Sequence, residues 1–211
     1  IDEDERLDPG TKYFVDSSRT IIARNDSPDV GFETSINPYR GCVHGCVYCF
    51  ARPFHDYLGF SSGLDFESRI MVKTDAPALL RRELQSKNWK PQVIVMSGVT
   101  DPYQPVERKL GITRKCLEIL RDYGNPVGII TKNHLVTRDV DILSDMASRS
   151  AAMVSVSITS LRRDIQRVME PRASTPERRL KAVEVLTKAG VPVNVMVAPV
   201  VPGLTDEEIP S

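Results

Sequence analysis

The most informative segment of this chain is Gly41-Cys42-Val43-His44-Gly45-Cys46-Val47-Tyr48-Cys49-Phe50. It places three of the four cysteines within eight residues, in a C-x3-C-x2-C spacing. Thiolates bind soft metals and iron–sulfur clusters, and three ligands this close in sequence surround a single object. A [4Fe–4S] cubane held by Cys42, Cys46 and Cys49 keeps one iron without a protein ligand. Because an open coordination position is typical of catalytic metal sites, the spacing indicates chemistry rather than cross-linking.

Other uses of these cysteines stay open at this point. Zinc would take the three thiolates together with His44 or His55, although no second C-x2-C pair is present. A thiol-redox loop is a further alternative. A disulfide framework spreads its cysteines along a small secreted chain, whereas these are clustered in 211 residues without a recognisable secretion signal. Clustered thiols point to a reducing compartment, so we expect a cytoplasmic protein.

Short β-branched runs alternate with helical patterns along most of the chain. Strands buried between helices in this way predict an α/β fold with a parallel sheet. Five strands are expected from Ser35 onward, which favours a (β/α) barrel or part of one, although periodicity does not separate it from a doubly wound open sheet. The expected strands are 35–40, 93–96, 127–130, 153–158 and 193–197, with a further extended segment at 69–73. The expected helices are 50–58, 78–86, 109–123, 139–148, 161–169 and 176–189, and Gly190 should end the last one.

Bulk composition is that of an ordinary globular domain. Lys+Arg and Asp+Glu both number 28, so no net charge directs the chain to nucleic acid or to an anionic membrane. The longest apolar stretch, 191–201, is interrupted by two prolines and an asparagine and is too short to span a bilayer. We divide the chain into an N-terminal lead-in, 1–34, and a core domain, 35–211. Because it starts with Ile1 and stops before a sixth strand, we expect trimmed ends and a core incomplete at its C-terminal end.

Parallel barrels carry their chemistry at the carboxyl ends of the strands. The segments expected around the cysteine loop are therefore those that follow the second to fifth strands, namely 97–105, 131–135, 157–160 and 198–202. Cys116, by contrast, lies in the helical pattern 109–123 in register with apolar residues, which predicts a small core residue.

The cysteine loop resembles the signature of the radical S-adenosylmethionine (SAM) superfamily, C-x3-C-x-aromatic-C, with Tyr48 at the aromatic position. Further stretches resemble its spore photoproduct lyase-like branch, which is labelled "DNA repair photolyase"; they are 36–42, 48–52, Thr100-Asp101-Pro102-Tyr103-Gln104-Pro105 and Thr131-Lys132. The resemblance implies a partial (β/α)6 TIM-like barrel. It also implies a [4Fe–4S] cluster whose open iron binds SAM, an electron donor of flavodoxin or ferredoxin type, and hydrogen abstraction from a substrate through a 5′-deoxyadenosyl radical.

The same resemblance suggests the cofactor-binding residues, and Tyr48 in the cysteine loop is one of them. Gly98 and Thr100 lie where the superfamily's backbone contacts the methionine amino group, and Asp101 is the acid placed to assist, unless Asp101-Pro102 is only a turn. Lys132 would pair with the methionine carboxylate, unless it is simply solvated. Ser157 is the candidate for the ribose hydroxyls.

The substrate is left open. Spore photoproduct lyase uses a hydrogen-donor cysteine just after its second strand, and the corresponding Met96-Ser97-Gly98-Val99 has none. Residues 162–181 hold seven basic side chains against three acids, which would suit nucleic-acid phosphates or simply a solvated helix. The competing function is a non-catalytic iron–sulfur or zinc protein that binds nucleic acid or a protein partner.

Overall fold

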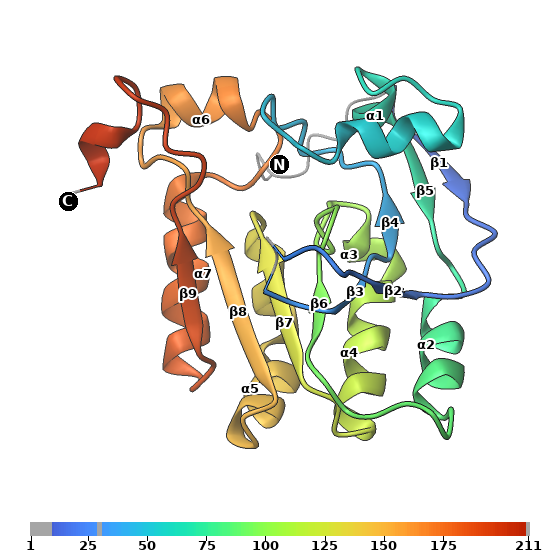
Figure 1. Ribbon diagram of the computed structural model, residues 1–211. Coiled ribbons are helices and arrows are strands. Elements are labelled where there is room, and N and C mark those ends of the chain that lie inside the picture. Colours follow the sequence, from blue (N-terminus) through green and yellow to red (C-terminus); the bar gives the residue numbers. More distant parts are fainter. Residues whose placement is uncertain (1–9, 29–30, 210–211) are drawn as a thin grey trace.

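The computed structural model describes residues 10–28 and 31–209, which form two sheets (Figure 1). The larger has six strands in the order β2-β3-β6-β7-β8-β9, and every neighbouring pair is parallel except β2 with β3. The parallel α/β architecture expected from the sequence is therefore confirmed. The strands of this sheet are β2 (Ile22–Arg24), β3 (Thr34–Ile36), β6 (Ile94–Met96), β7 (Val127–Thr131), β8 (Ala152–Ser157) and β9 (Val193–Met196).

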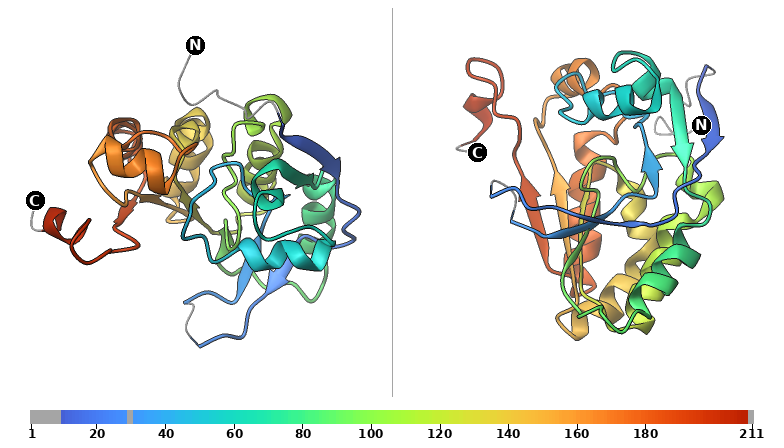
Figure 2. Two further views of the ribbon diagram at one scale, coloured as in Figure 1. Left: turned by 90° about the horizontal axis from the view of Figure 1, so that it is seen from above. Right: turned by 45° about the vertical axis from the view of Figure 1, so that its right-hand side comes forward.

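Helices cover one face of the large sheet in a row, as the views from the front and from above show (Figures 1 and 2). Neighbours in the row α2, α4, α5 and α7 contact one another, and their apolar sides bury the β-branched residues of β6, β7 and β8. This layer buries one face of the central strands, as expected for a parallel sheet covered by helices. The α-helices are α1 (Asp65–Ser68), α2 (Ala76–Leu84), α3 (Glu107–Leu110), α4 (Ile112–Asp122), α5 (Val140–Ser148), α6 (Arg163–Met169) and α7 (Pro176–Lys188), and the 3-10 helices are η2 (Arg52–Leu58), η3 (His134–Asp139) and η4 (Asp206–Glu208).

The smaller sheet corrects one expected strand. It has the order β1-β5-β4, with β1 at Lys12–Val15, β4 at Tyr39–Arg40 and β5 at Arg69–Val72. Residues 35–40, expected as a single strand, therefore contribute β3 to the large sheet and β4 to the small one. Pro38 lies between the two and has no N–H to donate to a ladder, and its carbonyl instead accepts from Lys73 N.

Helix boundaries follow the sequence pattern with two exceptions. The single helix expected at 109–123 is wrong, because Gly111 takes φ +61° and separates α3 from α4. The helix expected at 50–58 is the 3-10 helix η2. Gly190 adopts φ +78° just after α7, so the predicted helix end is confirmed.

The N-terminal lead-in is joined to both sheets within its described part, since β1 pairs with β5 and β2 pairs with β3. Residues 1–9, 29 and 30 of the lead-in, and residues 210–211 of the core, lie outside the described residues. Over the part that is described, β2 and β9 are the two edges of the large sheet and do not pair, so the fold is a partial, open barrel. No helix in that part is long and apolar enough to cross a membrane.

Candidate functional site

The cysteine loop lies over the carboxyl ends of the parallel strands, between α1 and α6 (Figure 1). Three backbone contacts hold it there. Val43 N donates to the Gln104 side chain after β6, and Val47 N donates to Met169 O at the end of α6. Arg172 N donates to His44 O. The loop is thus attached to the segments that follow β6 and β8, as expected for a site at this end of a barrel.

The three cysteines of the loop are free thiols with restricted access to solvent. Cys42 and Cys46 are buried and Cys49 is half-buried. Cys42 and Cys49 belong to a small apolar cluster with Phe66 and Val99. Gly41 and Gly45 adopt φ +78° and +67°, and a Cβ on Gly41 would lie 2.9 Å from Phe66 O, so the loop needs glycine at this position. Cys116 is buried in α4 among core residues, as expected.

Burial raises the pKa of Cys46 to about 12 and also raises that of Cys42. Within the described residues no three His, Cys, Asp or Glu side chains are grouped as a single metal ion would require. A cubane differs from a single ion in that each thiolate binds a different iron.

The segment after β6 contains Gly98 and Thr100. Ser97 takes φ +90°, which turns the chain, and a Cβ on Gly98 would lie 3.0 Å from the Ser35 side chain. The amides of Val99 and Thr100 donate to Asn37 Oδ1 at 2.9 and 3.3 Å. Thr100 Oγ1 donates to Tyr39 O at 2.8 Å. This segment is therefore bound to the chain that leads from β3 into the cysteine loop.

Asp101 is buried and joins three segments of the site. Its carboxylate accepts from Thr131 Oγ1 at 2.8 Å and from Lys132 N at 2.7 Å, both at the end of β7. The carboxylate also accepts from Tyr103 N, and this bond forms the turn that the sequence left as an alternative. One of its oxygens lies 3.5 Å from His44 Nδ1. Burial lowers the pKa of His44 despite this neighbouring carboxylate. Asp101 thus connects the cysteine loop to the β7 segment.

Lys132 and Tyr48 face each other, since Lys132 Nζ lies 5.7 Å from the centre of the Tyr48 ring. The Tyr48 hydroxyl donates to Glu170, which also accepts from Thr159 Oγ1 at 2.7 Å. Burial opposes ionisation of Glu170, but Arg179 and Lys132 hold its pKa below the ordinary value. An aromatic residue of the cysteine loop is therefore fixed by a buried carboxylate.

The carboxylate of Glu170 forms a fully buried ion pair with Arg179, with 2.6 Å between Oε2 and Nη2. Arg179 Nη1 donates to the carbonyl of Ser157, which is itself buried at the end of β8. Ser157 is thereby linked to Tyr48 through two charged side chains. Of the basic segment 162–181, Arg179 and half-buried Arg172 are thus committed to internal ion pairs, with Glu170 and Glu67 respectively.

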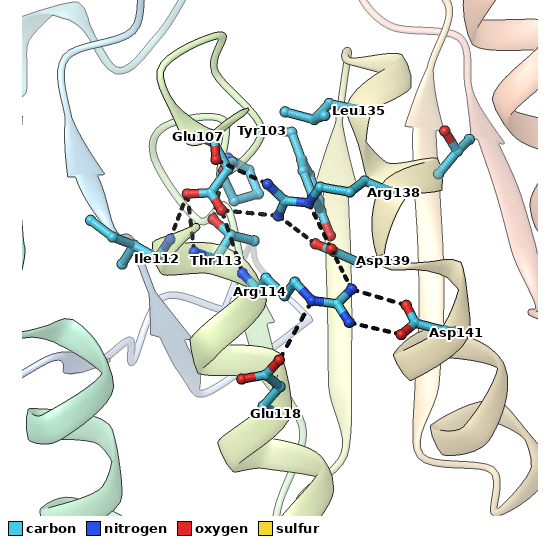
Figure 3. Close-up of polar contacts among 12 residues, drawn as sticks. Tyr103, Glu107, Ile112, Thr113, Arg114, Glu118, Leu135, Arg138, Asp139 and Asp141 are labelled. Carbon is cyan, nitrogen blue, oxygen red and sulfur yellow. Dashed lines mark hydrogen bonds and ion pairs between the residues drawn. The ribbon is translucent and has the colours of Figure 1, made fainter. Parts of the chain in front are cut away.

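Tyr103 belongs to a polar network beneath the site rather than to its surface (Figure 3). It is fully buried, with Arg138 over its ring. Glu107 accepts from the amides of Ile112 and Thr113 at the start of α4 and pairs with Arg138 at 3.0 Å. This network fixes the segments after β6 and β7 relative to α4.

The sequence pattern did not point to Asn37, Gln104, Glu170 or Arg179. Their partners are distant in sequence, and no spacing rule points to them. A signal existed for Asn37 and Gln104, because both lie in the stretches that carry the family resemblance.

Residues 36–211 match the radical SAM superfamily, and the chain belongs to it. This superfamily uses SAM and an iron–sulfur cluster. The cysteine loop, the parallel sheet and the segments at its carboxyl edge are the parts expected of such a protein.

Similarity to individual proteins supports the same assignment. An uncharacterized protein of Mycobacterium tuberculosis is 38% identical over 175 residues, covering 83% of this chain and 52% of its own length. One of Methanocaldococcus jannaschii is 30% identical over 179 residues, covering 84% and 64%. The chain thus spans about half the length of the first of these relatives.

Among solved structures, spore photoproduct lyase complexed with dinucleoside spore photoproduct superposes with a TM-score of 0.65 at 20% identity, covering 90% of this chain and 51% of that one. A variant of that lyase with bound AdoMet and dinucleoside spore photoproduct gives 0.63 at 21% identity, covering 89% and 50%. At this level of identity the likeness shows a shared fold.

Proposed function

We propose that Cys42, Cys46 and Cys49 hold a [4Fe–4S] cluster with one open iron, and that the chain uses it with SAM to abstract hydrogen from a substrate. The observation that carries the proposal is the position of the three free thiols on one loop, over the carboxyl ends of the parallel strands. Bound together, the reduced cluster and SAM supply methionine and a 5′-deoxyadenosyl radical. The chain's own side chains hold these groups, orient them and exclude water.

The polar groups around the loop suit the parts of SAM. Lys132 brings an ammonium to the Tyr48 side of the loop, where it would hold the methionine carboxylate. Gly98 and Thr100 would line the side of the amino group. Because the carboxylate of Asp101 already accepts several hydrogen bonds, its part would be to fix these segments and to add negative charge near that amino group. Ser157 would lie toward the ribose.

The test is anaerobic reconstitution with iron and sulfide, reduction with dithionite, and chromatography for 5′-deoxyadenosine with and without SAM. We expect SAM-dependent 5′-deoxyadenosine from the wild-type chain and none from Cys46→Ala, which should also lose the cluster. Cys116→Ala is the matched control, because it removes a buried thiol from the core of α4 and should retain both. Cleavage of SAM by Cys46→Ala would refute the ligand assignment. An intact cluster without cleavage, in the full-length protein as well, would favour the non-catalytic alternative.

For the substrate, we propose nucleic acid as the first class to test. Support comes from the fold shared with a lyase solved in complex with a dinucleoside photoproduct, and from exposed Arg162, Arg163 and Arg167 on and beside α6. The segment 96–99 lacks the cysteine that the lyase reaction would use, so a different hydrogen donor or reaction is implied. Consumption of damaged oligonucleotides together with formation of 5′-deoxyadenosine would support this substrate class. Formation of 5′-deoxyadenosine that does not change when these oligonucleotides are added would oppose it.

The reductant we propose is a flavodoxin- or ferredoxin-type protein, in the cytoplasm, where cysteines stay reduced. Replacement of dithionite by such a protein in the same assay tests this partner, and a failure to support cleavage where dithionite succeeds would exclude it.

A further inference from the structure

Gln104 forms a two-point clasp around Cys42. Its side-chain Oε1 accepts from Val43 N at 3.0 Å, and its Nε2 donates to Gly41 O at 3.0 Å. These two backbone groups flank Cys42 on either side. Gln104 is fully buried, so no water replaces these bonds.

The residues that precede Gln104 attach to the same loop. The side chain of Thr100 donates to Tyr39 O at 2.8 Å, and the carboxylate of Asp101 lies 3.5 Å from His44 Nδ1. The carboxylate of Asp101 accepts from Lys132 N at 2.7 Å. One short segment, Thr100–Gln104, therefore binds the residues that flank Cys42 on one side and Lys132 on the other.

The chemistry of a cluster makes such contacts matter. Each thiolate must be held close to its preferred geometry, and hydrogen bonds to the ligand sulfur tune the reduction potential. Without Gln104 the buried Val43 N–H and Gly41 C=O would lack partners, and the loop would open to solvate them.

We propose that Gln104 is a positioning residue that holds Cys42 in place for cluster binding, and that Asp101 couples this ligand to Lys132. The proposal rests on the proposed function, because it assigns Cys42 as a ligand. It goes beyond that function in naming what fixes the ligand. It also gives a physical reason for the Thr100-Asp101-Pro102-Tyr103-Gln104-Pro105 stretch, whose polar side chains bind the chain around the cysteines instead of reaching into solvent.

The experiment compares Gln104→Met with Asn125→Leu. Methionine keeps the length of glutamine but forms neither hydrogen bond. Asn125 is a matched control, because it is also buried and bridges backbone groups, donating to Gln92 O and Pro126 O at 3.0 Å, but at the opposite end of the strands. The first readout is the rate of iodoacetamide alkylation of Cys42 in the cluster-free chain, mapped by mass spectrometry with Cys116 as internal reference. The second is iron and sulfide per chain after reconstitution.

We expect Gln104→Met to accelerate alkylation of Cys42 about tenfold or more, as the loss of two buried hydrogen bonds implies, and to lower iron content severalfold. Asn125→Leu should lose thermal stability while leaving both readouts at wild-type values. Equal effects of the two variants, or wild-type values for Gln104→Met, would overturn the proposal.

A second variant keeps the test informative if Gln104→Met does not fold. Gln104→Asn keeps both polar groups but is one methylene shorter, so it cannot reach Val43 N and Gly41 O together. It should raise the alkylation rate of Cys42 clearly above the wild-type rate, and an unchanged rate would count against the clasp. If the wild-type chain binds no cluster, the proposed function fails, whereas the alkylation comparison still decides whether Gln104 holds Cys42.

Discussion

Replacement of Arg179 by methionine would remove one half of the buried ion pair below Tyr48. The guanidinium and the Glu170 carboxylate are both essentially inaccessible to solvent, at 0% and 1% exposure, and Nη2 lies 2.6 Å from Oε2. Arg179 also donates to Ser174 O at 2.7 Å and to Ser157 O at 3.0 Å. A buried charge left without its partner is the most destabilising result of such a change.

The expected loss is about 3–5 kcal/mol of unfolding free energy, the range found when one partner of a buried pair is removed. That is a large share of the roughly 5–15 kcal/mol that stabilises a typical domain. Glu170→Gln should also lower the unfolding free energy, because it leaves the buried Arg179 guanidinium without a carboxylate, although the amide oxygen still accepts from Tyr48 and Thr159. In the double variant the methionine no longer faces a charge. The loss of unfolding free energy in the double variant should therefore be at least about 2 kcal/mol smaller than the sum of the losses in the two single variants.

The assay is urea unfolding of the cluster-free wild type, the two single variants and the double variant at pH 7, with the slopes compared to exclude changes in the denatured state. A loss below about 1 kcal/mol for Arg179→Met would place the pair in the range of exposed salt bridges and refute the reasoning. Additive losses would likewise show that the two side chains do not interact in solution.

Three further predictions use other charged side chains. Lys132→Ala should leave the iron content unchanged but weaken SAM binding about tenfold or more, as expected for a lost charge-assisted contact. Lys181→Ala, on the exposed side of α7, is the control. An unchanged affinity of Lys132→Ala for SAM would remove this lysine from the site. Asp141→Asn should lower the unfolding free energy by less than about 1 kcal/mol, because its ion pair with Arg114 is largely solvated. We expect this small loss although hydrogen bonds from Arg114 lower the pKa of Asp141 to about 2. A larger loss in urea unfolding would contradict this. The lowered pKa of Glu170 means that its ionised form stabilises the fold above the ordinary value of about 4.5 and that this contribution disappears as the pH falls through the folded-state pKa. The difference in unfolding free energy between wild type and Glu170→Gln should therefore be constant near neutrality and shrink below about pH 4.5, and a difference that grows in acid would reverse the assigned sign.

The sequence predicted those parts of the molecule that depend on local pattern. The five parallel strands follow from short β-branched runs between helices, and the grouping of Cys42, Cys46 and Cys49 on one loop follows from their spacing. These features are local because thiolate spacing and side-chain periodicity are properties of a few consecutive residues.

The parts that were not predicted depend on distant partners or on backbone torsion. The break at Gly111 needs a φ that a helical pattern does not reveal, and the split at Pro38 depends on which sheet each half joins. Gln104 and Glu170 contact residues 61 and 122 positions away in sequence. Such contacts follow from the closure of the fold, so they emerge only once the strands are in register.

The edge of the large sheet at β9 is open over the described residues. Strand β9 is the last strand of the described sheet, and Val195 and Met196 on it are 49% and 37% exposed. An apolar edge strand is a template for the addition of another strand, which natural proteins usually prevent with charge or cover. Over the described residues this edge is therefore open to pairing with a further strand, whether from elsewhere in the same protein or from another molecule.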